Sequence, residues 1–262
     1  MLHFCTEIFF MYYLNMFYFD TINDKKILKS DLLKNVVHFF TTRETVLRSQ
    51  DVNLADAINA NKQSICNFYN INPENFVSPT QTHSANIEIA QVGKSNYPET
   101  DALILTNTEQ AIYLNFADCT PVIIYDTKQN IGAIAHAGWR GTVQRIAPLT
   151  IEKMVKECGS NVSDIIVAIG PAISKCCYNV GEDVYNKLQA TITNSQGLFE
   201  ERNDELYVDL KGINRQQLWE IGVEKIDVCP YCTVCDNDMF FSYRNENGTT
   251  CRHSAVFKIN QK

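Results

Sequence analysis

Three side chains in this sequence have the types and local contexts of ligands to one metal ion. His83 lies in the polar segment 79–86, Cys119 stands where one apolar segment stops and another begins, and His136 follows the apolar run 131–135. Ligands at strand ends can converge on one edge of a sheet. Zinc binds His nitrogen and Cys sulfur, and a site with three protein ligands keeps a fourth position for water or substrate. The residue types therefore indicate a catalytic zinc centre.

A plainer interpretation of the same residues stays open at this point. A histidine at a strand end is more often hydrogen-bonded than metal-bound, and a cysteine beside a proline is usually a small core residue. The long separations between His83, Cys119 and His136 match no compact zinc-finger pattern. Spacing alone does not choose between a metal centre and three structural residues.

The elements that must position these side chains alternate between strands and helices. Short apolar segments bounded by turn residues predict strands, and apolar residues at helical spacing predict helices. The expected strands are residues 36–41, 76–77, 87–92, 102–106, 111–116, 121–125, 131–136, 164–169, 225–228, 239–242 and 254–259, the last two forming a closing hairpin. The expected helices are residues 54–69, 142–158, 181–188 and 214–221. This order predicts an α/β (α+β) fold and, lacking a regular βαβ period, argues against a TIM barrel or a Rossmann sheet.

Composition limits the partners. The 262 residues carry a formal net charge of −7, and no basic run of the kind that follows a phosphate backbone is present. This balance argues against nucleic acid or a membrane surface as partner and favours a small diffusing substrate. The sequence also lacks the glycine-rich motifs that cradle dinucleotides and nucleoside triphosphates. Ten cysteines without framework spacing, in a chain long enough to fold without disulfides, indicate a reducing, cytoplasmic location.

The N-terminal residues are unusually aromatic. The apolar stretch 8–19 is interrupted by Asn15 and is shorter than the roughly 20 residues of a membrane span. No Lys or Arg precedes it, so the positive region of a signal peptide is missing. An edge strand is one interpretation. We favour the other, in which residues 1–15 are an extension upstream of a start at Met16, and residues 16–262 form a single catalytic domain.

Five ordered blocks of the sequence resemble the successive signatures of one protein family. They are Gln-Thr-His-Ser at 81–84, Ala-Asp-Cys-Thr-Pro-Val at 117–122, Ala-His-Ala-Gly-Trp-Arg-Gly-Thr at 135–142, Gly-Pro-Ala-Ile at 170–173 with Cys-Tyr-Asn-Val-Gly at 177–181, and Phe-Phe-Ser-Tyr-Arg at 240–244. The family is variously called laccase-domain or polyphenol oxidase proteins, peptidoglycan editing factors and purine nucleoside phosphorylases. The similarity runs from about His38 to Ile259.

The resemblance implies a zinc ion bound by His83, Cys119 and His136, with copper as the less favoured metal. It implies phosphorolysis of adenosine and inosine to a base and ribose 1-phosphate, cleavage of methylthioadenosine, and adenosine deamination in the same pocket. The implied partners are therefore a purine nucleoside and phosphate, and we expect a monomer or a small homo-oligomer. The implied fold is a single α/β domain of mixed β-sheets layered with helices.

Other residues in or near these blocks are candidates for catalysis and substrate binding. Guanidinium groups match phosphate oxygens bidentately, so arginines are the candidate phosphate ligands, although an exposed arginine is more often a solvated charge. Asp118 could orient a ligand or move a proton, although an aspartate beside a strand end often caps a turn. An aromatic ring could stack on the purine. The candidate catalytic residues are Asp118, Arg140 and Cys119, and the candidate substrate-binding residues are Arg43, Gln81, Phe241, Tyr243 and Arg244.

The sequence departs from the family pattern at three places. Residues 44–46 read Glu-Thr-Val where paired glycines are usual, Lys62 stands where an arginine is usual, and Cys251 replaces a glycine. The metal ligands are intact, so these departures bear on the substrate contacts. Lysine offers a point charge in place of the guanidinium fork.

The remaining cysteines raise the question of a second metal site. The Cys-x-x-Cys-x-x-Cys run formed by Cys229, Cys232 and Cys235 could wrap zinc or an iron–sulfur cluster, with Cys251 as a fourth thiolate. No Cys-Pro follows the run, and the family pattern needs only Cys232, so we expect unliganded thiols. The adjacent pair at 176–177 is of a kind that disulfide geometry rarely joins, and we expect two buried thiols there.

Four other functions compete with the phosphorylase. A Cys-His hydrolase would use Cys119 as nucleophile, activated by His136 or His83. A copper-dependent phenol oxidase fits the ligand types, but multicopper oxidases need more histidines than the five present. An enzyme that edits peptidoglycan precursors follows from another of the family's names. A structural zinc module is the weakest, because structural sites normally close with four ligands.

Overall fold

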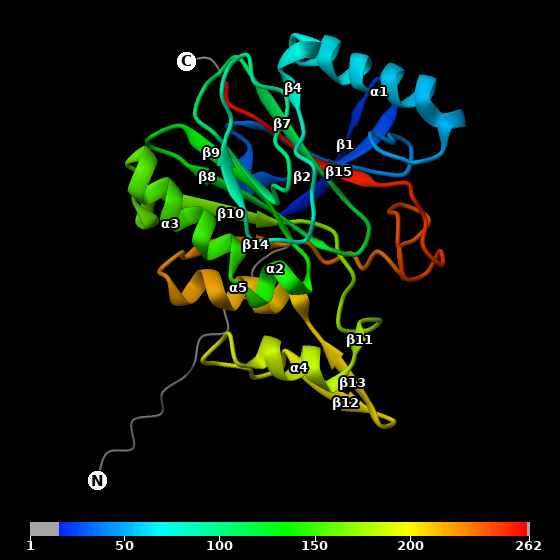
Figure 1. Cartoon of the computed structure of the whole chain (residues 1–262), viewed down its shortest axis with the longest axis vertical. Coiled ribbons are helices and arrows are strands. Elements are labelled where there is room, and N and C mark those ends of the chain that lie inside the picture. The colour runs from blue at the N-terminus through cyan, green and yellow to red at the C-terminus, as the bar shows by residue number, and fades with distance from the viewer. Residues whose placement is uncertain (1–15, 261–262) are drawn as a thin grey trace.

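The structure is a computed structural model that describes residues 16–260 (Figure 1). The expected extension, residues 1–15, lies outside the described residues. The α-helices are α1 (Ala55–Phe68), α2 (Trp139–Val143), α3 (Ile146–Cys158), α4 (Glu182–Gln189) and α5 (Leu210–Glu220). The strands are β1 (Phe17–Ile22), β2 (Lys25–Ser30), β3 (Val37–Thr41), β4 (Phe76–Val77), β5 (Ile87–Ile89), β6 (Ala102–Leu105), β7 (Ala111–Phe116), β8 (Thr120–Asp126), β9 (Ile131–Ala137), β10 (Ile165–Ile169), β11 (Asn179–Val180), β12 (Phe199–Arg202), β13 (Glu205–Val208), β14 (Lys225–Val228) and β15 (His253–Lys258).

Two six-stranded sheets pack face to face around the main hydrophobic core. One sheet has the strand order β1-β2-β3-β15-β7-β4, and the other has the order β14-β10-β8-β9-β6-β5. Because side chains alternate along a strand, every second residue points between the sheets. Leu114, Ile134 and Phe257 are fully buried in this shared core. Gly132 allows a close approach of the sheets, since a Cβ there would lie 2.1 Å from the Phe257 ring.

Helices cover the outer faces of both sheets. Ile151 and Met154 of α3 pack with Leu218 of α5 against the outward-facing residues of β8 and β9. On the other sheet, Ile65 of α1 packs with Phe39 of β3. The expected architecture of mixed sheets layered with helices is confirmed.

A small antiparallel sheet of order β11-β13-β12 lies beside α4 at one end of the molecule (Figure 1). Its strands were not expected, because β12 and β13 have only four residues each and three of the four in β12 are charged. The β1–β2 hairpin was not expected either. Its turn uses Asn23 and Asp24 with positive φ, a conformation that Asn and Asp adopt more readily than other non-glycine residues.

Two expected elements are wrong. The helix expected over residues 142–158 is divided into α2 and α3 at Arg145, whose φ of 60° is left-handed and incompatible with a continuous helix. The closing hairpin does not form, because residues 239–242 lie in a turn-rich loop. Strand β15 pairs instead with β3 and β7, far away in the sequence.

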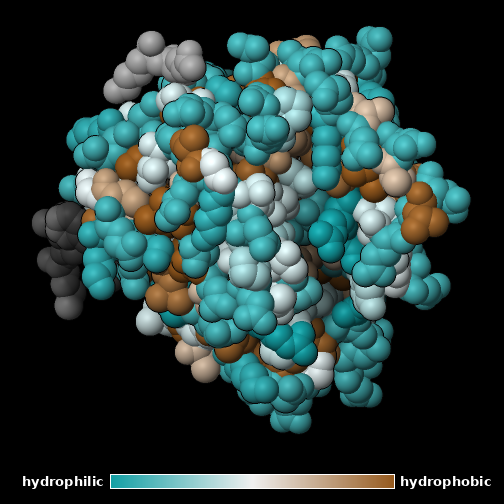
Figure 2. All heavy atoms as spheres, turned by 45° about the horizontal axis from the view of Figure 1, so that its top comes forward, coloured by the Kyte–Doolittle hydropathy of each residue, from teal (hydrophilic) through white to brown (hydrophobic). Residues whose placement is uncertain are grey.

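Among residues 16–260, no helix is long and apolar enough to cross a membrane. On the face shown in Figure 2, hydrophilic residues cover most of the surface and hydrophobic residues occur in small groups. Such scattered apolar residues are ordinary on a protein surface.

Candidate metal centre

Strand pairing in the second large sheet brings Cys119 next to His136. Cys119 directly precedes β8, and the antiparallel register of β8 and β9 places Pro121 opposite His136. Asp118 supports the sharp turn between β7 and β8 with a φ of 81°. His83 comes from the loop between β4 and β5. The ligand atoms of His83, Cys119 and His136 lie within 4.8 Å of one another, so the structure brings these three residues together.

A buried carboxylate that the sequence analysis missed, that of Asp101, organises this cluster. Its Oδ1 accepts a hydrogen bond from the backbone N–H of His83 at 3.0 Å and lies 2.8 Å from Nδ1 of His136. Its Oδ2 accepts from the backbone N–H groups of Thr82 and Ser84 and from the Ser84 hydroxyl. Asp101 therefore orients one histidine and holds the loop of the other. Carboxylates commonly play this part behind metal-bound histidines.

The donor set fits a metal ion with three protein ligands. Because Nδ1 of His136 faces Asp101, Nε2 is the ring nitrogen left for Cys119 and a metal. A Cβ at Gly138 would lie 2.9 Å from Sγ of Cys119 and 3.3 Å from the His83 ring, so a larger residue would crowd the ligands. Two imidazoles and one thiolate suit zinc, and they also occur in copper sites.

His136 and its neighbours Cys119 and Asp101 perturb one another's ionisation. Burial alone would raise the pKa of the Cys119 thiol, but the charges and hydrogen bonds of His136 and His83 lower it to about 6. Burial would lower the pKa of His136, but Cys119 and Asp101 raise it to about 9. Burial likewise opposes ionisation of Asp101, yet hydrogen bonds from His136 and Ser84 hold its pKa well below the usual value. Cys119 is therefore a thiolate at neutral pH, the form that binds metals or attacks an electrophile.

The candidate ligands face a cavity of about 490 Å³. This volume falls within the roughly 300–1,000 Å³ of small-molecule sites. The wall combines the three ligands with polar, aromatic and basic side chains, among them Arg48, Gln81, Asp118, Tyr178, Tyr243, Arg244 and Arg252.

Gln81 and Asp118 lie on the cavity wall but use their side chains to hold the backbone. The Gln81 amide makes two hydrogen bonds to the backbone of Asn115, both at 2.9 Å. The Asp118 carboxylate accepts from the Thr233 hydroxyl at 2.6 Å and from the backbone N–H of Arg244 at 2.7 Å. Both residues therefore shape the cavity.

Tyr243 and Arg244 also line the cavity. The Tyr243 side chain is 57% exposed, so one face of its ring is accessible to a ligand. The Arg244 guanidinium donates to the backbone and side-chain oxygens of Asn179. Both residues lie on the wall of the cavity that the candidate metal ligands face.

Three expected site residues lie outside the cavity lining. Arg43 forms a bidentate ion pair with Glu246, at 2.8 and 3.2 Å, and its guanidinium covers the buried ring of Phe241 at 4.3 Å. This corrects the expectation that Arg43 binds phosphate and Phe241 stacks on the purine. Arg140 is exposed on α2, over Trp139.

The cavity contains basic and aromatic residues that the sequence analysis did not select. Arg48 and Arg252 come together across an isolated β-bridge. Within residues 16–260, no carboxylate forms an ion pair with Arg48, Arg244 or Arg252. Tyr178 is buried, and burial together with the neighbouring Cys119 raises its pKa, so its hydroxyl keeps its proton. Arg252 follows Cys251, the residue that departs from the family's usual glycine, and this family block was the sequence signal that could have identified Arg252 as a cavity residue.

Two further histidines within the described residues lie in the core. Burial is the main cause that lowers the pKa of His38 to about 4 and that of His253 to about 3. Neither lines the cavity. They add no metal ligands to the site.

The other cysteines cluster differently in the structure from the way the sequence pattern suggested. One member of the 176–177 pair is exposed and the other partly exposed, so the expectation of two buried thiols was wrong. This pair lies beside Cys232 and Cys235. Cys229 and Cys251, which the sequence pattern had suggested as fellow ligands, lie outside this group.

Comparison with known proteins agrees with this geometry. Residues 38–260 match the family described as Multi-copper polyphenol oxidoreductase laccase. A purine nucleoside phosphorylase of Bacteroides thetaiotaomicron is 31% identical over 247 residues, which cover 84% of this chain and 92% of that protein. A protein of an unknown prokaryotic organism, named adenosine deaminase RL5, is 30% identical over 65% of this chain and 70% of its own.

The fold is shared with a solved structure as well. The crystal structure of the hypothetical protein YfiH from Bacillus licheniformis has a TM-score of 0.85 and 27% identity, with coverage of 94% of this chain and 100% of that one. With its three potential metal ligands beside a cavity, the protein is an enzyme. It belongs to the laccase-like polyphenol oxidoreductase family, as its sequence blocks predicted.

Proposed function

We propose that this enzyme is a zinc-dependent purine nucleoside phosphorylase that cleaves adenosine, inosine and methylthioadenosine with phosphate and also deaminates adenosine. One observation carries the proposal. A single cavity joins the His83, Cys119 and His136 cluster to three arginines that lack carboxylate partners within the described residues. The names of the relatives from Bacteroides thetaiotaomicron and from an unknown prokaryote support the two activities.

His83, Cys119 and His136 would hold the zinc ion. When bound, zinc would supply Lewis-acid polarisation of a substrate oxygen and activation of water for deamination. Asp101 fixes the ring of His136 beforehand, which reduces the cost of organising the ligands. Copper oxidase chemistry is the weaker interpretation, because multicopper centres need more histidines than this cavity provides.

Arg48, Arg244 and Arg252 are placed to bind phosphate. In phosphorolysis a phosphate oxygen forms a bond to C1′ of the ribose while the bond from C1′ to the purine nitrogen breaks, and the base leaves with the bonding electrons. Guanidinium groups pair with phosphate oxygens in a fixed geometry. They can therefore hold the nucleophile in line with C1′ and make the attack effectively intramolecular.

Tyr178 and Tyr243 are the candidate purine contacts. The accessible ring of Tyr243 offers a stacking surface. The protonated hydroxyl of Tyr178 can donate a hydrogen bond to a purine nitrogen that gains electron density as the glycosidic bond breaks.

The test combines metal analysis with product analysis. Purified protein should contain zinc at His83, Cys119 and His136 and should release hypoxanthine from inosine only when phosphate is present. His136→Ala should lose both that zinc and the activity. Stoichiometric zinc without turnover of any purine nucleoside would reject the phosphorylase.

A Cys-His hydrolase is the second candidate, supported by one observation. The lowered pKa of Cys119 and the raised pKa of His136 describe a thiolate–imidazolium pair of the kind that cysteine hydrolases use. Metal-free protein that stays active, and that loses activity when Cys119 is alkylated, would favour this function over the phosphorylase.

A further inference from the structure

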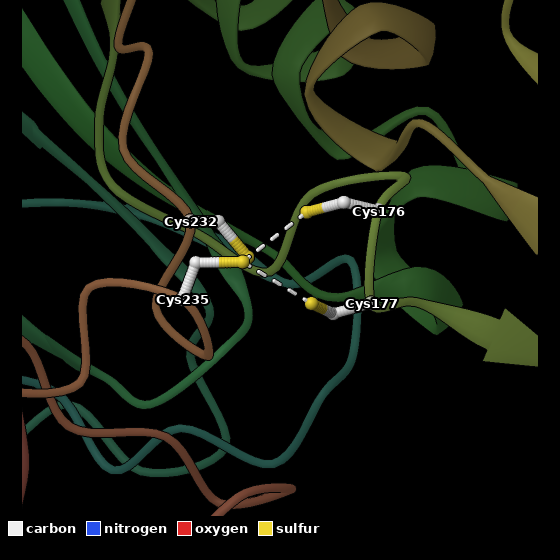
Figure 3. A group of neighbouring side chains, drawn as sticks. All are labelled: Cys176, Cys177, Cys232 and Cys235. Carbon is white, nitrogen blue, oxygen red and sulfur yellow. Dashed lines mark hydrogen bonds between the residues drawn. The ribbon is translucent and has the colours of Figure 1, made fainter.

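A second group of potential metal ligands lies away from the cavity: Cys176, Cys177, Cys232 and Cys235. The first two lie in the loop between β10 and β11, and the other two lie in the loop that follows β14. Figure 3 shows the two pairs approaching from opposite sides, with their sulfur atoms directed toward one another. The loops are more than 50 residues apart in sequence, so only the fold brings these thiols together.

The separations of the sulfur atoms match the edges of a tetrahedron around one ion. All four sulfur atoms lie within 4.8 Å of one another, and Sγ of Cys235 is 3.6 Å from that of Cys176 and 3.4 Å from that of Cys177. A Zn–S bond of about 2.3 Å gives a tetrahedral S–S edge of about 3.8 Å. Cys235 approaches two sulfur atoms almost equally, as a vertex of a tetrahedron does and as one half of a disulfide does not.

We propose that these four cysteines form a closed, structural zinc site. Four thiolates complete the tetrahedral coordination of zinc and leave no position for a substrate. Two ligands come from one Cys-x-x-Cys turn, the spacing that zinc-binding loops commonly use. Iron–sulfur clusters are less well matched, because several iron atoms need their thiolates farther apart than ligands of one ion.

The backbone around Cys232 supports this assignment. The N–H of Ser174 donates to Sγ of Cys232 at 3.4 Å, a contact that stabilises negative charge on sulfur. Two hydrogen bonds close the turn. The backbone N–H of Cys232 donates to the Asp236 carboxylate, and the backbone N–H of Asp236 donates to the Cys232 carbonyl, both at 2.8 Å. These bonds fix the direction of Cys232.

The site would brace the wall of the catalytic cavity. Cys232 forms a β-bridge with Ala172, and the N–H of Thr233 donates to the carbonyl of Ala172 at 3.2 Å. Thr233 in turn donates to the carboxylate of Asp118, which directly precedes Cys119. The loop that holds the first cysteine pair continues into Tyr178 on the cavity wall. Zinc would therefore tie together two loops that shape the substrate site.

The test is the zinc content of the full chain, purified under reducing conditions and measured by elemental analysis. We expect two zinc ions per wild-type chain and one in Cys235→Ser. Cys176→Ser provides a second variant, and both residues are exposed, so their replacement opens no core cavity. Cys158→Ser, at the end of α3 and outside both groups, is the matched control and should keep two. His136→Ala should keep the four-cysteine ion, which separates this site from the proposed catalytic one.

A thiol titration of the wild type checks the proposal without any variant. Five thiols, the four of this group and Cys119 of the proposed catalytic ion, should react with a thiol reagent only after a strong chelator removes both metal ions. In protein loaded with Co²⁺, thiolate-to-cobalt charge-transfer absorption should fall strongly in Cys235→Ser and persist in the control. Unchanged zinc content in both cysteine variants would overturn the proposal. So would four freely reactive thiols in native protein, or two disulfides found by mass in place of the metal.

Discussion

Among residues 16–260, the molecule holds two groups of potential metal ligands that differ in number and in surroundings. His83, Cys119 and His136 supply three ligands and face a cavity, whereas Cys176, Cys177, Cys232 and Cys235 supply four and face no part of that cavity. Three ligands leave a coordination position open, and four close it. This difference is why we propose chemistry for the first group and stabilisation for the second.

The backbone conformation also differs between the two groups. His83 and Asp118, at the three-ligand centre, have positive φ, which is unusual for residues other than glycine. Within residues 16–260, none of the four cysteines does. Positive φ also occurs in ordinary turns of this chain, such as that of Asn23 and Asp24, but at His83 it is the contact with Asp101 that holds the backbone. A structural ion needs no such arrangement.

The largest expected effect separates the two groups directly. His136→Ala should reduce kcat/KM for phosphate-dependent inosine cleavage at least about 100-fold, because it removes a ligand of the catalytic ion. The four-cysteine zinc should remain. Steady-state kinetics and elemental analysis of the same preparation measure both. Activity within threefold of wild type would remove the assignment of chemistry to the three-ligand centre.

The next effect tests the support behind that centre. Asp101→Asn should weaken metal binding about 10- to 100-fold, because the amide no longer provides the carboxylate that orients His136. Competition with a chelator of known affinity measures the loss. Asp126→Asn is the matched control, since Asp126 is also fully buried but caps a turn beyond the far end of β8. Equal affinity in Asp101→Asn and wild type would contradict the role of Asp101.

A smaller effect distinguishes Arg43, which the sequence analysis selected as a phosphate ligand, from Arg252, which it did not select. Arg252→Gln should raise the KM for phosphate about tenfold, because Arg252 lines the cavity. Arg43→Gln should leave that KM within twofold and should instead lower the free energy of unfolding, because Arg43 pairs with Glu246. Kinetics at varied phosphate and urea denaturation check the two outcomes. The reverse pattern would restore Arg43 as the phosphate ligand.

The smallest effect concerns the ion pair between Arg43 and Glu246. Glu246 lies in the loop that carries Tyr243 and Arg244 of the cavity wall, so this part of the wall is stabilised by an ion pair and not by a metal. Burial would raise the pKa of Glu246, but the hydrogen bond and charge of Arg43 help to lower it from 4.5 to about 2. A carboxyl with a lowered folded-state pKa stabilises the fold above pH 4.5 and loses this contribution as the pH falls toward 2. Glu246→Gln should therefore cost roughly 1–3 kcal/mol at pH 7.

Urea denaturation of the wild type and Glu246→Gln across this range measures that contribution. The difference in unfolding free energy should shrink as the pH falls from 4.5 toward 2. A difference that stays constant with pH would show that the pair is not the cause. Zinc content should not change in the variant, in contrast to the cysteine variants.

Much of the fold was predictable from local patterns. Strands such as β8, β9 and β10 are continuous apolar segments between turn residues, and the sequence predicted each of them within two residues at either end. Strands β12 and β13, with four residues each, are too short to carry such a pattern. The break at Arg145 did leave a local sign, which the sequence analysis did not use. Pro148 lies in the first turn of α3, and its missing N–H could not continue a helix that began at residue 142.

The sequence by itself determined the types of the potential metal ligands and, through its ordered blocks, the family and the candidate trio His83, Cys119 and His136. Only the tertiary structure selected Asp101 as their support, Arg252 over Arg43 for the cavity, and the 176–177 pair as partners of the Cys232–Cys235 turn. The physical reason is that local patterns report burial and backbone preference. Contacts between distant segments depend on strand register and loop paths, which the packing of the whole chain decides.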